Sequence, residues 1–143
     1  MDYIKEKLYQ QLAIDYCCQV SDIKDDKNHF TEYEKLKGRR QFEEAADCVL
    51  KVIAVNGKLI FTGKKSIIEV CRKQFSNNSG NWFMDASNFR KLDEILMNDG
   101  YRVKTAHPFF IPKDDCVHEI NGVKIKKYRS MKKFLLSIAA LAM

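Results

Sequence analysis

The sequence predicts an α+β domain with a mixed, mainly antiparallel sheet, two Asn-Gly hairpins, two central helices and a helix at each terminus. Three observations carry this prediction. The chain has 143 residues, 45% hydrophobic and 31% charged, as is typical of one globular domain. Asn-Gly dipeptides at 56–57 and 121–122 each separate two runs of β-favouring residues. Other segments repeat apolar residues at helical spacing.

The first element is a predicted helix over residues 2–19, where apolar side chains recur every four residues. These side chains are Ile4, Leu8, Leu12 and Tyr16. Ser21 follows as the predicted N-cap of a short turn. Residues 29–33 favour a strand through their β-propensity, and residues 35–44 read as an exposed connection.

The first hairpin is predicted over residues 49–63. Its turn is Asn56-Gly57, because both central positions of a type I′ turn need positive φ. Gly63 ends the second strand. Ser66 and Glu69 have the spacing of a capping box, which predicts a helix that runs to about residue 75.

The second central helix is predicted over residues 86–98. Asp85 is its expected N-cap, and Gly100 lies where a helix C-terminus favours left-handed backbone. Residues 101–111 read as a strand that Pro108 confines to an edge or a bulge.

The last fifth of the chain is predicted to differ from the rest. Residues 1–112 hold 18 basic and 16 acidic side chains, whereas residues 113–143 hold 7 and 3. We expect the second hairpin at Asn121-Gly122, followed by an apolar helix over residues 130–143, both packed on the same domain. No run of about 18 apolar residues predicts a membrane-spanning helix.

The five cysteines predict a cytoplasmic protein with reduced thiols. Their number is odd, and no C-x-x-C spacing of a zinc or redox site occurs. The N-terminus is charged and amphipathic, unlike a signal peptide. The Cys116-x-His118 pair is weak evidence for a metal, so no metal site is expected.

Several residues form a set in this order along the chain. They are Leu12-Ala13-Ile14-Asp15, Asn28-His29-Phe30, Gly38-Arg39-Arg40-x-Phe42, the Asn56-Gly57 hairpin ending in Phe61-Thr62-Gly63, Trp82-Phe83-Met84 and His107-Pro108-Phe109-Phe110-Ile111-Pro112. This set resembles the N-terminal half of a group of bacterial GNAT-type N-acetyltransferases from Firmicutes, over about residues 5–112. In that group this half is a degenerate module ahead of the catalytic one.

The sequence departs from the family at its cofactor loop. The family's Q/R-x-x-G-x-G/A pattern, whose glycines let backbone N–H groups approach a pyrophosphate, is absent. No catalytic residue can be carried over, so the resemblance implies a half-module without a cofactor. Acetyl-CoA is expected only if the chain is a divergent acetyltransferase.

Two groups of cations are candidates for binding an anion or polyanion. Arg39 and Arg40 follow a glycine and could hold a phosphate or carboxylate, although pairing with Glu43 and Glu44 in an exposed loop is the alternative. The second group lies within ten residues that hold no acid. Its members are Lys124, Lys126, Lys127, Arg129, Lys132 and Lys133. They could follow a nucleic-acid backbone or contact an acidic protein, or they could be a solvated surface.

Three further features have alternative interpretations. His107 could act as a general base, but no nucleophile accompanies it in the sequence, which favours a structural histidine. Residues 82–84 could be an aromatic platform, or a hydrophobic staple at a helix start. The uniformly apolar residues 134–143 should be buried, which predicts self-association through the C-terminal helix.

The function predicted from the sequence is a binding or regulatory role rather than catalysis, in a small GNAT-like protein without the acetyl-CoA loop. Whether the chain is an enzyme stays open. One alternative is a divergent N-acetyltransferase that uses acetyl-CoA. The other is a small nucleic-acid-binding or nucleoprotein-binding protein that uses the basic segment of residues 124–133.

Overall fold

The computed structural model describes residues 3–40, 48–104 and 106–108. The chain divides into two compact units, Met1–Pro108 and Phe109–Met143, and the described residues belong to the first. The second hairpin, the C-terminal helix and the boundary predicted at residue 112 lie outside the described residues. No helix among those residues is long and apolar enough to cross a membrane.

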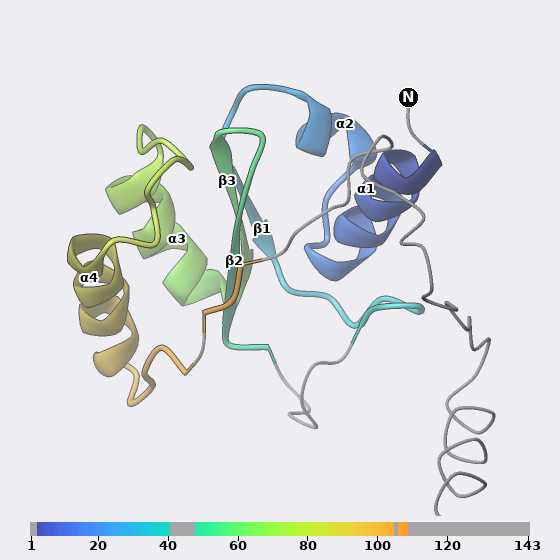
Figure 1. The fold of residues 1–143 in the computed structure, drawn as a ribbon. Helices are drawn as coiled ribbons and strands as arrows, with labels where there is room; N and C mark the ends of the chain where they lie inside the picture. Colours follow the sequence, from blue (N-terminus) through green and yellow to red (C-terminus); the bar gives the residue numbers. More distant parts are fainter. Residues whose placement is uncertain (1–2, 41–47, 105, 109–143) are drawn as a thin grey trace, which may run out of the picture. The chain divides into compact units, whose positions relative to one another are not determined.

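The described fold is α+β, as predicted, with a three-stranded mixed sheet in the order β1-β3-β2. The strands are β1 His29–Glu32, β2 Leu50–Val55 and β3 Lys58–Gly63. The helices are α1 Tyr3–Asp15, α2 Val20–Lys24, α3 Lys65–Phe75 and α4 Ala86–Met97. Figure 1 shows α1 and α2 on one side of the sheet, with α3 and α4 on the other.

The sheet pairs its strands in both directions. β2 and β3 are antiparallel and joined by Asn56 and Gly57, whose φ angles of 52° and 79° are those a type I′ turn needs. β1 pairs with β3 in parallel, with Phe30 beside Phe61. The expectation of a mainly antiparallel sheet is therefore too simple for the described strands, because one of their two pairings is parallel. In sequence, β2 comes between the two parallel strands, although in the sheet it lies at the edge.

The central strand β3 is buried along its whole length and divides the core in two. Leu59 and Phe61 pack with α3 and α4, where Phe75 and Phe83 meet edge to face at 5.3 Å between ring centroids. Ile60 points the opposite way, since side chains alternate along a strand, and joins the cluster under α1 and α2. The alternating side chains of β3 thus hold one pair of helices on each face of the sheet, which gives three layers.

Two helix ends differ from the prediction. The first helix ends at Asp15 rather than at residue 19, because Cys17 takes a φ of 50° and its Sγ accepts a hydrogen bond from the Glu34 N–H at 3.2 Å. The next helix is capped by Gln19 rather than Ser21. The Gln19 N–H donates to the Asp22 carboxylate at 2.9 Å. Contacts within the turn therefore decide both where α1 ends and where α2 begins.

The predicted capping box at Ser66 is wrong. The helix α3 begins at Lys65 with Lys64 as its N-cap, because the Lys64 N–H continues the sheet by donating to the Val49 carbonyl at 2.9 Å. No side chain caps this helix. By contrast, α4 begins after Asp85 as predicted, and Gly100 follows it with a φ of 79°.

The strand predicted from residue 101 is absent from residues 101–104 and 106–108. The backbone N–H groups that a strand would have used are bonded to α4 instead. The Tyr101 N–H donates to the Leu96 carbonyl at 2.9 Å, and the Val103 N–H donates to Asp93 Oδ1 at 2.7 Å. The β-favouring composition is overridden because this segment folds back along the helix.

Candidate functional site

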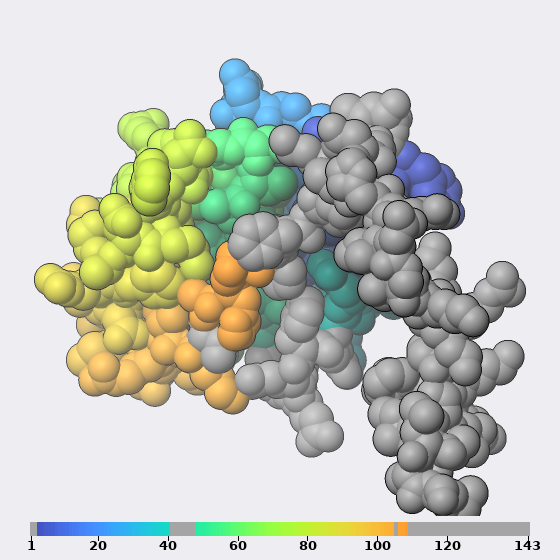
Figure 2. Space-filling model, in the orientation of Figure 1, coloured from blue at the N-terminus to red at the C-terminus, as the bar shows by residue number. Residues whose placement is uncertain are grey.

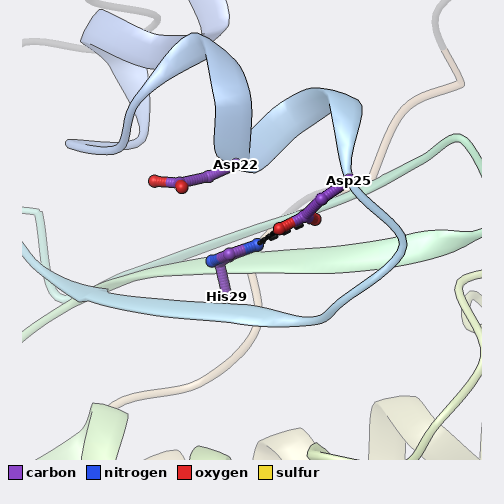
Figure 3. A group of neighbouring side chains, drawn as sticks. All are labelled: Asp22, Asp25 and His29. Carbon is purple, nitrogen blue, oxygen red and sulfur yellow. Dashed lines mark hydrogen bonds and ion pairs between the residues drawn. The ribbon is translucent and has the colours of Figure 1, made fainter.

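One cluster of charged side chains lies where α2 meets the sheet; we call Asp22, Asp25, His29 and Lys58 the ion cluster. His29 and Lys58 project from β1 and β3 on the face that α2 covers, and the aspartates come from α2 and the residue after it. Figure 3 shows His29 bonded to Asp25, at 2.9 Å from its Nε2 to Oδ2, with Asp22 beside them.

Lys58 is the buried member of the ion cluster, with 3% of its side chain exposed. Its Nζ donates to Asp25 Oδ1 at 2.5 Å and to the Asp22 carbonyl. The hydrogen bond from Lys58 holds the pKa of the Asp25 carboxyl well below its usual range; partial burial opposes this shift, and the hydrogen bond to His29 adds to it. The Asp25 carboxyl is therefore ionised at neutral pH.

Three side chains of the ion cluster are of the kinds that bind metal ions. One ligand atom each from Asp22, Asp25 and His29 lies within 4.8 Å of the others. However, the Lys58 ammonium already occupies Asp25 Oδ1, and Asp22 Oδ2 accepts the N–H of Gln19. A divalent cation would have to displace Lys58, so the arrangement is that of an internal ion pair with a structural role.

Little in the sequence predicts the ion cluster. The one feature of the sequence that points to it is the four-residue spacing of Asp25 and His29. Lys58 and Asp25 are 33 residues apart, and their contact depends on the β1–β3 pairing.

Arg40, one of the predicted anion-binding residues, makes a buried internal contact. The Arg40 side-chain Nε lies 2.6 Å from Asp15 Oδ2, and the Arg40 backbone N–H donates to Asp15 Oδ1 at 2.7 Å. The Asp15 side chain is 1% exposed, so the guanidinium neutralises a carboxylate at the end of α1. The predicted alternative partners, Glu43 and Glu44, lie outside the described residues.

Arg39 lies at a second basic region. Its guanidinium stacks over the Tyr33 ring at 4.6 Å, and Tyr33 lines a small depression of about 160 Å³. The other residues of the depression are Glu32, Cys48, Gly63, Lys64 and Lys65. It lies where the parallel strands β1 and β3 both end and where α3 begins.

We call this region the basic edge: Lys64 and Lys65, which line the depression, Arg39, which stacks on its Tyr33, and Lys51. Lys51 belongs to it because its charge and that of Arg39 both act on Cys48. Burial raises the pKa of the Cys48 thiol, and these two positive charges oppose that rise. Lys64 donates to the Tyr101 hydroxyl at 2.9 Å, and Lys65 lies 3.4 Å from Glu32.

Two residues of the basic edge leave hydrogen-bonding groups without a protein partner. The Tyr33 hydroxyl is buried and has no hydrogen-bond partner within the part of the chain that the structure describes. The first turn of α3 lacks a side-chain cap at Lys64, which leaves its first backbone N–H groups without a side-chain acceptor. These N–H groups can donate to an acceptor, and the surrounding cations favour an acceptor that carries negative charge.

None of the other described candidates lines the depression. His107 is exposed. Phe83 is buried in the core, whereas Trp82 and Met84 beside it are 84% and 51% exposed. The six cations of residues 124–133 lie outside the described residues, as do Cys116 and His118.

Comparison of the chain with protein-family models, with curated proteins and with solved structures finds no match.

Proposed function

We propose that this chain is a non-catalytic binding module of GNAT-like kind, and that it recognises an anionic group at the basic edge. One observation carries the proposal: Lys64 and Lys65 line a depression at the start of α3, Arg39 stacks on the Tyr33 of its wall, and Glu32 is the one acid among the described residues that line it. A phosphate or carboxylate would pair with these cations and receive hydrogen bonds from the start of α3.

Two observations favour binding over catalysis. The parallel strands β1 and β3 stay paired from His29 to Glu32, whereas the acetyl-CoA cleft of the family lies between splayed parallel strands. The Cys48 thiol at the basic edge has a raised pKa, which disfavours the thiolate that a nucleophile would need.

The first experiment measures thermal stability with inorganic pyrophosphate and, separately, with acetyl-CoA. Since a ligand that binds the folded state raises its stability, we expect pyrophosphate to raise the unfolding temperature of the wild-type chain. The double variant Lys64→Gln/Lys65→Gln should lose most of that rise. The matched control is Lys73→Gln/Lys91→Gln, which removes the same charge from exposed positions on α3 and α4.

An equal pyrophosphate effect in both double variants would contradict a site at the basic edge. A rise with acetyl-CoA but not with pyrophosphate would instead favour the divergent acetyltransferase, because the binding energy would then come from the acyl and pantetheine parts of the cofactor.

The nucleic-acid alternative shares the phosphate chemistry and differs in its salt dependence. For each phosphate of a duplex that the protein neutralises, the logarithm of the binding constant falls by about 0.9 per unit rise in log salt. Binding of a duplex oligonucleotide with a steep slope, reduced in Lys64→Gln/Lys65→Gln, would extend the proposed ligand to a polyanion. Binding that is independent of salt would exclude this alternative.

A further inference from the structure

The segment between α3 and α4 presents a tryptophan to solvent on an unfavourable backbone. Trp82 is 84% exposed, although its indole is among the side chains that gain most from burial. Its φ is 59°, in the left-handed region that disfavours residues with a bulky side chain. The described core buries little of the indole, so an exposed tryptophan with this φ points to a role outside that core.

The segment is held rigidly on both sides of Trp82. On one side, the Gly80 N–H donates to the Gly57 carbonyl at 2.8 Å, and Gly80 lies so close to Lys58 that an added Cβ would be 2.4 Å from its carbonyl oxygen. On the other side, Phe83 is 2% exposed and its ring packs against Phe61 and Phe75. Because its backbone is held on both sides, the segment loses less conformational freedom on binding than a free loop would.

The segment is also uncharged. No acidic or basic residue occurs from Gln74 through Met84, in a chain that carries a net charge of +6. Figure 2 shows this segment at the surface, in lime green. Its exposed polar residues are Ser76, Asn77, Ser79 and Asn81, whose side chains can both donate and accept hydrogen bonds.

We propose that Trp82 is the centre of a contact between two copies of this chain, formed by residues 76–84. In a two-fold contact each patch faces its own copy, so every group near the axis must tolerate an identical group. Amides, hydroxyls and apolar side chains satisfy this condition, whereas like charges repel. This inference is independent of the basic edge, and it assigns self-association to a different surface from the C-terminal helix that the sequence suggested.

Trp82 is the sole tryptophan of the chain, so its fluorescence reports directly on the proposed contact. We expect sedimentation to show a monomer–dimer equilibrium across a concentration series. Over the same series the tryptophan emission should shift to shorter wavelength and acrylamide quenching should fall, because the indole leaves water.

Two variants test the contact without disturbing the core. Trp82→Asn replaces the indole with a residue that tolerates positive φ, so the chain should stay folded, while self-association weakens by about tenfold or more, as for a tryptophan at the centre of an interface. Asn81→Asp keeps the reporter and places two like charges opposite each other; it should weaken association, less so at high salt. The matched control is Tyr3→Asn, which removes another exposed aromatic side chain, 78% exposed, from α1.

Three results would overturn the proposal. They are a chain that stays monomeric over the whole series, a dimer that Trp82→Asn leaves unchanged, and association with no change in tryptophan emission or quenching.

Discussion

At the residue scale, the least expected feature is a buried lysine at the start of the central strand. Lys58 begins the central strand β3, and its ammonium is buried against Asp25 and the Asp22 carbonyl. Burying an ion is unfavourable unless it is paired and hydrogen-bonded. The ion cluster meets this condition, so the positions of α2 and β3 depend on each other through one ion pair.

The ion pair predicts a specific pH dependence. Because the pKa of Asp25 is lowered in the folded state, its stabilising contribution is fully present above the pKa of an unfolded aspartate, about 3.9. The contribution is lost as the pH falls from there toward the lower folded pKa. Asp25→Asn should therefore lower the free energy of unfolding by about 1–3 kcal/mol at pH 7 and by less at pH 3.

Urea unfolding of both proteins at the two pH values measures this difference. Asp26→Asn is the control, since Asp26 is an exposed neighbour in the same turn. A loss of stability that is equal at pH 7 and pH 3 would show that Asp25 acts through its shape rather than through its charge.

At the element scale, the α3–α4 connection illustrates what local patterns predict and what they miss. Asp85 and the apolar spacing after it correctly predicted where α4 begins. Gly80 marks the place where the connection lies against β3, at Lys58. Such an approach between segments distant in sequence leaves no local signal beyond the glycine itself.

Two glycine substitutions separate close approach from backbone strain. Gly80→Ala would place a Cβ 2.4 Å from the Lys58 carbonyl oxygen and 2.6 Å from its nitrogen, and backbone atoms cannot move aside easily. We expect a loss of about 2–4 kcal/mol in the free energy of unfolding. Gly100→Ala has open space around the new Cβ but a φ of 79°, so it should lose only about 1 kcal/mol.

Chemical unfolding of the two variants and the wild-type chain checks this order. An alanine at position 80 that is as stable as the wild type would mean that the loop can lift away from β3 without loss.

At the scale of the whole molecule, the described core lies within the unit Met1–Pro108. It has two clusters, one under α1 and α2 and one under α3 and α4. Within the described residues, this unit thus has a packed cluster on each face of its sheet. A unit with its own core on both faces of a sheet meets the usual condition for independent folding.

The fragment of residues 1–108 should therefore fold without the rest of the chain. We expect a cooperative thermal transition and dispersed amide resonances whose positions match those of the full chain for residues of the two clusters. A fragment with collapsed resonances would show that residues 109–143 supply part of the core.

The sequence by itself determined the α+β class, the existence of α1, α3 and α4, and the turn position at Asn56-Gly57. These features depend on spacing and turn chemistry within a few residues. Only the tertiary structure decided the parallel β1–β3 pairing, the burial of Lys58 beside Asp25, the contact of Arg40 with Asp15 and the assembly of the basic edge. Each of these brings together residues far apart in the chain, and the free energy that selects such contacts comes from the packed layers rather than from local propensity.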